Sequence, residues 1–157
     1  MPLADDAVEV RAQGWRTLAA LHAAIDAPLE RALSAEHGLS VVEYTVLDAL
    51  SRQDGWHLRM HQLARAAALS ASAATRLVNR LEARGLLMRI LCDDDRRGIY
   101  TELTQAGSAL LAAARATHDR VLATALAEAQ ETPELAPLVA ALSGLPRPAP
   151  ARVPSPS

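Results

Sequence analysis

The chain has 157 residues and contains no lysine, no phenylalanine and only one cysteine, Cys92. A single cysteine cannot form a disulfide within the chain, which excludes a fold held together by internal disulfide bonds. No run of apolar residues approaches the ~18 that a membrane-spanning helix requires. The mixture of acidic and basic residues at positions 1–16 excludes the apolar segment of a secretory signal. We therefore expect a cytoplasmic protein with no membrane partner.

Because lysine is absent, every basic residue is arginine, and the arginines are unevenly distributed. Residues 52–97 hold nine arginines and five acidic residues, a net charge of +4, whereas the whole chain carries −2 and the remainder therefore −6. A basic centre between acidic ends is typical of a nucleic-acid-binding segment between segments that do not touch nucleic acid. The planar guanidinium can contact phosphate or guanine through two bonds at once, which lysine cannot do.

The first third of the chain has a helical pattern. Its apolar residues recur at spacings of three and four, at Trp15, Leu18, Leu21, Ile25, Leu29 and Leu33. Pro28 interrupts this stripe, and we expect a kink or break near residues 24–28 because proline lacks a backbone donor and clashes with the preceding turn. Gly38 predicts a helix end, and Ser40 with Glu43 forms a capping box that opens the next helix.

The element order continues with a short strand at 56–59 and two helices, at 60–67 and 70–84, separated only by Ala68 and Leu69. A strand at 86–92, a charged turn at 93–98 and a returning strand at 99–103 form a hairpin. Thr104 then caps a helix that extends to about Gln130, and a short helix ends near Gly144. A tight helix pair followed by a hairpin is the winged helix-turn-helix arrangement.

The helix predicted at 70–84 is amphipathic. Its apolar face holds Ala74, Leu77, Val78 and Leu81, and Ser70 is placed to cap its N-terminus. The opposite, polar face contains no acidic residue and consists of Ser72, Arg76 and Asn79, with Thr75 and Arg80 on its flanks. Such a face also occurs on ordinary solvated helices, but its position in the helix pair favours DNA contact. We expect these side chains and Ser70 to contact phosphates and base edges.

The turn predicted at 93–98 contains three acidic residues and two arginines. Three carboxylates would repel phosphate unless they were paired, so we expect Asp95 to orient a neighbouring arginine. We expect Arg96 and Arg97 to contact DNA, with Arg97 projecting from the tip into the minor groove, where negative potential is concentrated. The alternative is a charged surface turn of the kind found in many hairpins.

Taken together, these motifs resemble the MarR family of winged helix-turn-helix transcription regulators. The resemblance is carried by TRLVNRLEARGL at 75–86, Asp95-Arg96-Arg97 and LTQAG at 103–107, and LSVVEYTVLDAL at 39–50 is similar to the family's second helix. It covers about residues 10–143. Two positions depart from the family pattern. His61 stands where a Ser or Thr cap is usual, and Ala68 where the turn often has Gly.

The resemblance implies a mainly α-helical fold with a small β-hairpin. It divides the chain into an N-terminal dimerisation helix (1–37), a winged DNA-binding lobe (38–104), C-terminal dimerisation helices (105–145) and a disordered proline-rich tail (146–157). It implies a ligand-responsive repressor that binds palindromic duplex DNA as a homodimer, with Ser72, Thr75, Arg76 and Arg80 in the major groove and Arg97 in the minor groove. The long apolar stripes of the terminal helices independently favour a second copy.

The sequence specifies the signal that controls such a regulator less clearly than it specifies the DNA contacts. Members of the family often bind small aromatic or phenolic acids, and Trp15, Arg16, His22 and Tyr44 are the candidate residues for such a cleft. We expect no cofactor and no metal. Cys92 is a candidate oxidation sensor, although the adjacent Asp93 and Asp94 oppose thiolate formation.

Two other classes of function were weighed. A winged-helix protein-interaction module without DNA binding is one alternative. An enzyme is another, since His57 and His61 are four residues apart, a spacing known from metal sites. No glutamate completes a metal-binding helix motif, and the chain has no glycine-rich phosphate loop. We therefore predict that the protein is not an enzyme.

Overall fold

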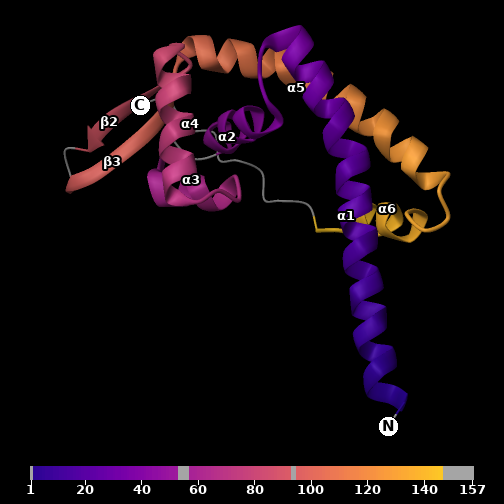
Figure 1. The fold of residues 1–157 in the computed structure, drawn as a ribbon. Coiled ribbons are helices and arrows are strands. Elements are labelled where there is room, and N and C mark those ends of the chain that lie inside the picture. Colours follow the sequence, from indigo (N-terminus) through magenta and orange to yellow (C-terminus); the bar gives the residue numbers. More distant parts are fainter. Residues whose placement is uncertain (1, 53–56, 93–94, 147–157) are drawn as a thin grey trace.

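The computed structural model describes residues 2–52, 57–92 and 95–146, and their side chains except at 2–5, 57, 92 and 95–98. Figure 1 shows the arrangement of the elements. In chain order these are α1 (Pro2–His37), α2 (Val41–Ser51), β1 (His57–Arg59), α3 (Met60–Ala66), α4 (Ala71–Ala83), β2 (Leu87–Cys92), β3 (Asp95–Leu103), α5 (Gln105–Gln130) and α6 (Ala136–Ser143). The predicted tail lies outside the described residues beyond Pro146.

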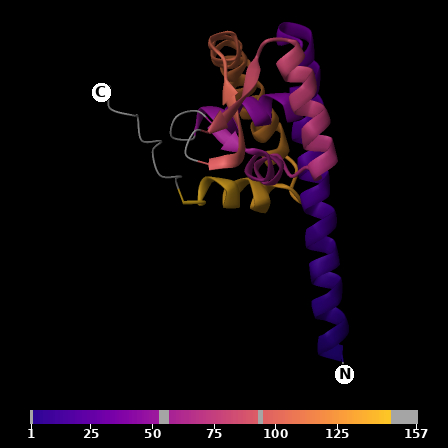
Figure 2. The same cartoon turned by 90° about the vertical axis from the view of Figure 1, so that its left-hand side faces the viewer.

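The described chain has two parts. The winged lobe comprises α2, β1, α3, α4, β2 and β3, and the helical arm comprises α1, α5 and α6 (Figure 1). In the arm, α1 packs along α5, and α6 packs on α5. Both views of the ribbon show the N-terminal half of α1 extending beyond the rest of the chain (Figure 2). The expected winged helix-turn-helix lobe with additional helices is therefore confirmed.

Helix ends follow the capping signals of the sequence. The Ser40 hydroxyl accepts a bond from the Glu43 amide, and the Glu43 carboxylate accepts one from the Ser40 amide, so the predicted capping box is present. Gly38 has a φ of 63°, the left-handed conformation that ends a helix readily only in glycine. Ala68 has a φ of 54° in the turn between α3 and α4. This unfavourable conformation for a side chain explains why glycine is common in such turns.

Two expectations about helix ends were wrong. The break expected near Pro28 is absent, because α1 is continuous from Pro2 to His37. The buried Leu29 and Leu33 anchor the turns after the proline and compensate for its missing donor. The cap of α3 is Arg59 rather than His61, and its backbone amide donates to the Gln62 side chain at 3.0 Å.

The three strands form an antiparallel sheet in the order β1-β3-β2. In β2 and β3, Leu87 pairs with Leu103 and Leu91 with Ile99, followed by a register shift after which Cys92 pairs with Asp95. Strand β3 therefore begins at Asp95, and the turn predicted at 93–98 was too long. Leu91 and Ile99 are exposed, so this end of the hairpin projects beyond the core. The pair of Cys92 and Asp95 starts the strand earlier than predicted, and the register shift leaves residues 96–98 opposite no residue of β2.

The main hydrophobic core joins the lobe to the arm. Leu47 and Leu50 of α2 and Val78 and Leu81 of α4 are fully buried in it, together with Leu33 of α1. Leu111 and Ala114 of α5 complete this core from the other side. A second, smaller cluster ties Leu21 of α1 to Ala129 of α5 and Val139 of α6. The lobe is therefore anchored on one end of the arm, with α4 and the hairpin turned outward.

Candidate nucleic-acid interface

Helix α4 separates an apolar and a polar face as its sequence predicts. Ala74, Leu77, Val78 and Leu81 are all buried. The Ser70 hydroxyl accepts a bond from the Ala73 amide at 3.2 Å, so Ser70 is the predicted N-cap. Burial of one whole face fixes the rotation of the helix and determines which side chains point away from the lobe.

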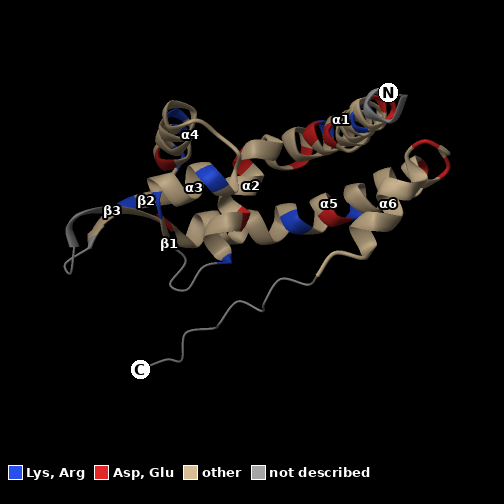
Figure 3. Ribbon diagram, turned by 90° about the horizontal axis from the view of Figure 1, so that it is seen from below, with Lys and Arg blue, Asp and Glu red and all other residues tan. Residues whose placement is uncertain are grey.

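The polar face of α4 is exposed at every predicted position, namely Ser72, Thr75, Arg76, Asn79 and Arg80. Arg76 and Arg80 make no ion pair or hydrogen bond within the described part of the chain. The Thr75 hydroxyl donates to the Ala71 carbonyl of its own helix at 3.0 Å. Arginines also lie on α3 and on the strands beside α4 (Figure 3). The outer face of α4 therefore presents two uncompensated guanidinium groups to an incoming anion.

The side chain of Asn79 on this face is bonded to another element of the lobe. Its Oδ1 atom accepts a short hydrogen bond from Arg89 Nη2, and Arg89 is on β2. The other terminal nitrogen of Arg89 lies 3.8 Å from Glu82, which is one turn further along α4. Sequence reasoning missed both Arg89 and Glu82. Their signal was the three-residue spacing of Asn79 and Glu82, which places them on one side of the helix.

The residues expected to form the wing contacts lie on strand β3. The backbone of Asp95, Arg96 and Arg97 is strand, so Arg97 does not lie at a loop tip as expected. Their side chains, and with them the expected role of Asp95, lie outside the described part of the structure. Pairing of β3 with β2 nevertheless places this segment on the hairpin that lies beside α4 (Figure 1).

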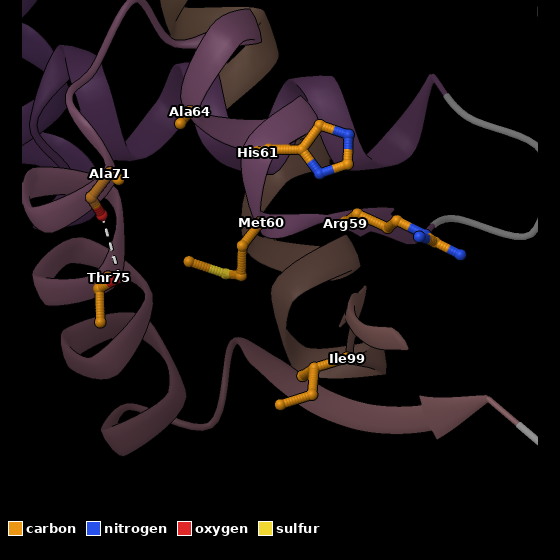
Figure 4. A pocket seen from close by; sticks show the side chains of 7 residues that line it. All are labelled: Arg59, Met60, His61, Ala64, Ala71, Thr75 and Ile99. Atoms are coloured by element: carbon orange, nitrogen blue, oxygen red, sulfur yellow. Dashed lines mark hydrogen bonds between the residues drawn. The ribbon is translucent and has the colours of Figure 1, made fainter. Parts of the chain in front are cut away.

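A pocket of about 410 Å³ separates α3 and α4 from β3. Figure 4 shows its lining, in which Met60 extends between Thr75 of α4 and Ile99 of β3. Arg59 and His61 complete the polar part of the lining. The Arg59 guanidinium lies 5.2 Å from the centre of the Tyr100 ring, and its Nε donates to the Tyr100 hydroxyl at 3.1 Å. This pair connects the start of α3 to β3, a link that the sequence did not indicate.

The four residues expected to form an effector cleft are not brought together within one chain. Trp15, Arg16 and His22 are exposed on α1, and Arg16 pairs with Glu9 at 2.8 Å. Tyr44 is instead buried on α2, with its ring stacked on that of His118 at 4.4 Å between centroids. Burial raises the pKa of the Tyr44 hydroxyl, and the nearby charge of Asp48 raises it further.

A cluster of charged side chains joins α2 to α5 at the junction of lobe and arm. Asp48 accepts hydrogen bonds from Arg115 and from Arg52, both at 2.8 Å. Burial alone would raise the pKa of Asp48, but these two arginines outweigh it and hold the pKa below its ordinary value of 3.8. The Nε atom of Arg115 is buried without a hydrogen-bond partner among the described residues. The junction thus contains one unsatisfied cationic donor.

Two further expectations concern metals and membranes. No three His, Cys, Asp or Glu side chains within the described residues are placed to hold a metal ion. His57 is on β1 and His61 is on α3, so the pair does not share a helix. Within the same residues, none of the helices combines the length and the apolar character needed to span a bilayer.

Comparison with known proteins agrees with this architecture. Residues 37–98 match the sequence profile of the MarR family. Sco3205 of Streptomyces coelicolor, a MarR family transcriptional regulator solved in complex with DNA, is 28% identical with a TM-score of 0.70, over 83% of this chain and 81% of that chain. The transcriptional regulator BldR of Sulfolobus solfataricus is 27% identical with a TM-score of 0.70, over 88% and 98%. No curated protein matches the chain.

A more distant structure shows the same fold. BpsR of Bordetella bronchiseptica, whose DNA binding is regulated by 6-hydroxynicotinic acid, is 20% identical with a TM-score of 0.68, over 84% of this chain and 96% of that chain. The fold and the exposed face of α4 define a winged helix-turn-helix protein. Residues 37–98 match the MarR family of transcriptional regulators, and the structural likeness to regulators of that family extends through the arm.

Proposed function

We propose that this chain regulates transcription as a ligand-responsive repressor, by binding palindromic duplex DNA as a homodimer. The observation that carries the proposal is the outer face of α4, where Arg76 and Arg80 are exposed and make no ion pair among the described residues. An uncompensated cationic helix face beside a hairpin has the shape and charge to enter a major groove, while the hairpin reaches the neighbouring backbone.

The proposed contacts differ in what they can read. Arg76, at the centre of the face, has the reach and the two parallel donors needed for guanine. Ser70 and Ser72, at the helix N-terminus, are placed for phosphate, where the helix dipole also favours an anion. Arg96 and Arg97 on β3 are assigned to the minor groove and its backbone. In this proposal α4 supplies base discrimination, and the hairpin supplies affinity.

A homodimer is supported by the uncovered apolar side chains of α1. Val8, Val10, Trp15 and Leu18 are exposed on the part of α1 that extends beyond the chain's own core. A second copy that covers them would place two winged lobes on the same side of one duplex, which matches a palindromic site.

The response to a ligand is proposed at the junction of lobe and arm. The unsatisfied Arg115 Nε and the aromatic pair of Tyr44 and His118 supply a cationic donor and ring surfaces, which suit a small aromatic or phenolic acid. BpsR, of the same fold, responds to such an acid. Release of DNA when 6-hydroxynicotinate or 4-hydroxybenzoate is added to a binding titration would support this part of the proposal.

In this proposal the chain has no catalytic role. It acts in the cytoplasm, where it would meet its DNA. The alternative switch is oxidation of Cys92, whose side chain lies outside the described part of the structure. A protein-interaction module without DNA binding is less favoured, since it would have no use for the uncompensated face of α4.

The test is a salt-titrated binding series on a selected operator and on a scrambled duplex. Arg76→Ala should cost roughly 1 to 3 kcal/mol per half-site and relax discrimination at one position. Arg97→Ala should weaken binding to both duplexes and lower the salt dependence, with sequence effects confined to A·T-rich positions. Because each dimer carries every substitution twice, the losses per dimer should be nearly double those per site.

The matched control is Arg31→Ala, which removes an exposed arginine of the same charge from α1 rather than from α4 or the hairpin. It should leave discrimination unchanged. If both test variants bind the operator as tightly as the parent does, the assignment of α4 and the hairpin to DNA is wrong, and the protein-interaction alternative gains support.

A further inference from the structure

One side chain of strand β2, Arg89, bonds to the polar face of α4. Its guanidinium donates to Asn79 through Nη2 and lies 3.8 Å from Glu82 through Nη1, so one side chain bridges two successive turns of α4. Helix α4 and strand β2 are also in direct contact with each other. We call the set of Arg89, Asn79 and Glu82 the α4–β2 clamp.

We propose that Arg89 is a positioning residue that fixes α4 relative to the hairpin through the α4–β2 clamp, and that Asn79 serves this clamp rather than reading a base. This inference rests on the proposed function. The inference extends the proposed function in two ways. It gives Asn79, an expected DNA contact, a structural role, and it assigns a function to Arg89, which was not among the residues predicted to contact DNA.

The hydrogen-bonding capacity of Asn79 is the first argument. Recognition of adenine by asparagine requires both the carbonyl oxygen as acceptor and the amide nitrogen as donor. In this chain the carbonyl oxygen of Asn79 is already occupied by Arg89. The Arg89 guanidinium therefore orients the Asn79 carboxamide toward β2 rather than toward an incoming base.

The direction of the side chains on α4 is the second argument. Residues three or four apart share a side of a helix, so Thr75, Asn79 and Glu82 form one row. Thr75 lines the pocket that also contacts Ile99 of β3, and the other two hold Arg89 of β2. These three residues therefore face the hairpin, whereas Arg76 makes no hydrogen bond or ion pair with the hairpin among the described residues.

The position of Arg89 explains what the clamp controls. Arg89 pairs with Thr101 of β3, which is fully buried, so this part of the hairpin is fixed to the core. The same two strands extend outward to Arg96 and Arg97. A dimer places α4 and the hairpin in grooves of defined separation, so a change in their mutual orientation should reduce preference for the operator more than binding to DNA in general.

The experiment compares operator and scrambled duplex across a salt series, as for Arg76. Arg89→Gln should lower the ratio of operator to scrambled affinity by about tenfold, because each dimer carries two clamps. The slope of affinity against salt should change no more than it does in Arg84→Gln. That control removes the same charge from the end of α4, where Arg84 pairs with Glu43 of α2 at 3.4 Å instead of with the hairpin. It should retain the parental ratio.

The double variant Arg89→Glu with Glu82→Arg provides the rescue. It keeps the net charge, and the new carboxylate can accept from both Asn79 and the new arginine. It should restore most of the ratio that either single change loses. If Arg89 instead contacts phosphate, the exchange will not restore binding, Arg89→Gln will flatten the salt slope, and the clamp is refuted.

A thermal-unfolding cycle gives a readout that does not depend on DNA. Asn79→Ala and Arg89→Gln should be non-additive in the melting temperature, since each removes the same bond. Additive effects would overturn the clamp even if the protein binds its operator. Conversely, a parent protein that shows no preference for any duplex would refute the proposed function while the coupling still decides whether the clamp exists.

Discussion

The winged lobe and the helical arm differ in how their apolar surface is covered. In the lobe, the inner faces of α2 and α4 are buried by the chain itself, down to zero exposure at Val46, Leu47, Val78 and Leu81. On α1 of the arm, Trp15 is 71% exposed and Leu18 is 48% exposed, although both continue the stripe that is buried from Leu21 onward. The inner faces of α2 and α4 are thus covered within one chain, whereas part of the apolar stripe of α1 is not.

The largest expected effect follows from this difference. The purified parent should have about twice the 16.7 kDa chain mass in light scattering, with α1 at the interface. Trp15→Asp combined with Leu18→Asp should give monomers at micromolar concentration. Each side chain of this size contributes about 2 kcal/mol when fully buried, and every dimer would lose four of them while burying four carboxylates.

The control for the dimer is Gln13→Asp, which adds one carboxylate, against two in the double variant, at a neighbouring exposed position of α1. It should remain dimeric. A parent protein that is monomeric at these concentrations would show that the exposed stripe of α1 has another purpose, and the homodimer would have to be abandoned.

The second prediction concerns two glycines of the arm, one where α5 meets the lobe and one on the exposed part of α1. A Cβ atom at Gly107, in the first turn of α5, would lie 1.9 Å from the Leu86 carbonyl oxygen and 2.9 Å from Leu103. The clash is with backbone, which cannot move aside. Gly107→Ala should therefore lower the free energy of unfolding by about 3 kcal/mol or more, measured by urea denaturation at fixed protein concentration.

The matched substitution, on the exposed part of α1, is Gly14→Ala. Nothing lies within 4 Å of a Cβ at Gly14 in α1. Alanine should thus stabilise the helix by up to about 1 kcal/mol. If Gly107→Ala is tolerated, the close approach of α5 to the base of the hairpin is wrong. If Gly14→Ala destabilises, a partner chain packs closely on that part of α1.

The features that sequence reasoning predicted well are those determined by a few neighbouring residues. The Ser40 and Glu43 box, the cap at Thr104 and the buried face of α4 each depend on spacings of three or four residues, and all are present. Their physical basis is local, since a capping bond or an amphipathic face needs no knowledge of the rest of the fold.

The features that it missed depend on contacts between distant segments. Pro28 does not break α1 because burial of the following turn outweighs the loss of one backbone bond. Strand β3 extends to Asp95 because Asp95 pairs with Cys92 of β2 across a register shift. Asn79 has the composition of a base-reading residue, yet Arg89 of β2 occupies its carbonyl oxygen. None of these partners can be identified from spacing along the chain.

The smallest predicted effect concerns the junction between the two parts. Asp48 has a pKa below its ordinary value of 3.8, because hydrogen bonds from Arg52 and Arg115 outweigh its burial. A carboxyl with a lowered folded-state pKa contributes stability that is fully present above its ordinary pKa and is lost as the pH falls through the lowered value. At pH 7 we expect Asp48→Asn to cost about 1.5 to 3 kcal/mol, the range for hydrogen bonds to charged groups.

This cost should shrink in acid. Below the ordinary pKa of 3.8 the unfolded chain protonates Asp48 before the folded chain does, so the stability contributed by the charged carboxylate decreases and the two proteins should approach each other in stability. Urea unfolding at pH 7 and at about pH 3 measures the difference directly. The control is Glu9→Gln, which breaks the exposed pair with Arg16 near the free end of α1 and should change little at either pH. A difference between parent and Asp48→Asn that stays constant with pH would show that the contribution of Asp48 does not depend on its charge, and that lobe and arm are joined by packing alone.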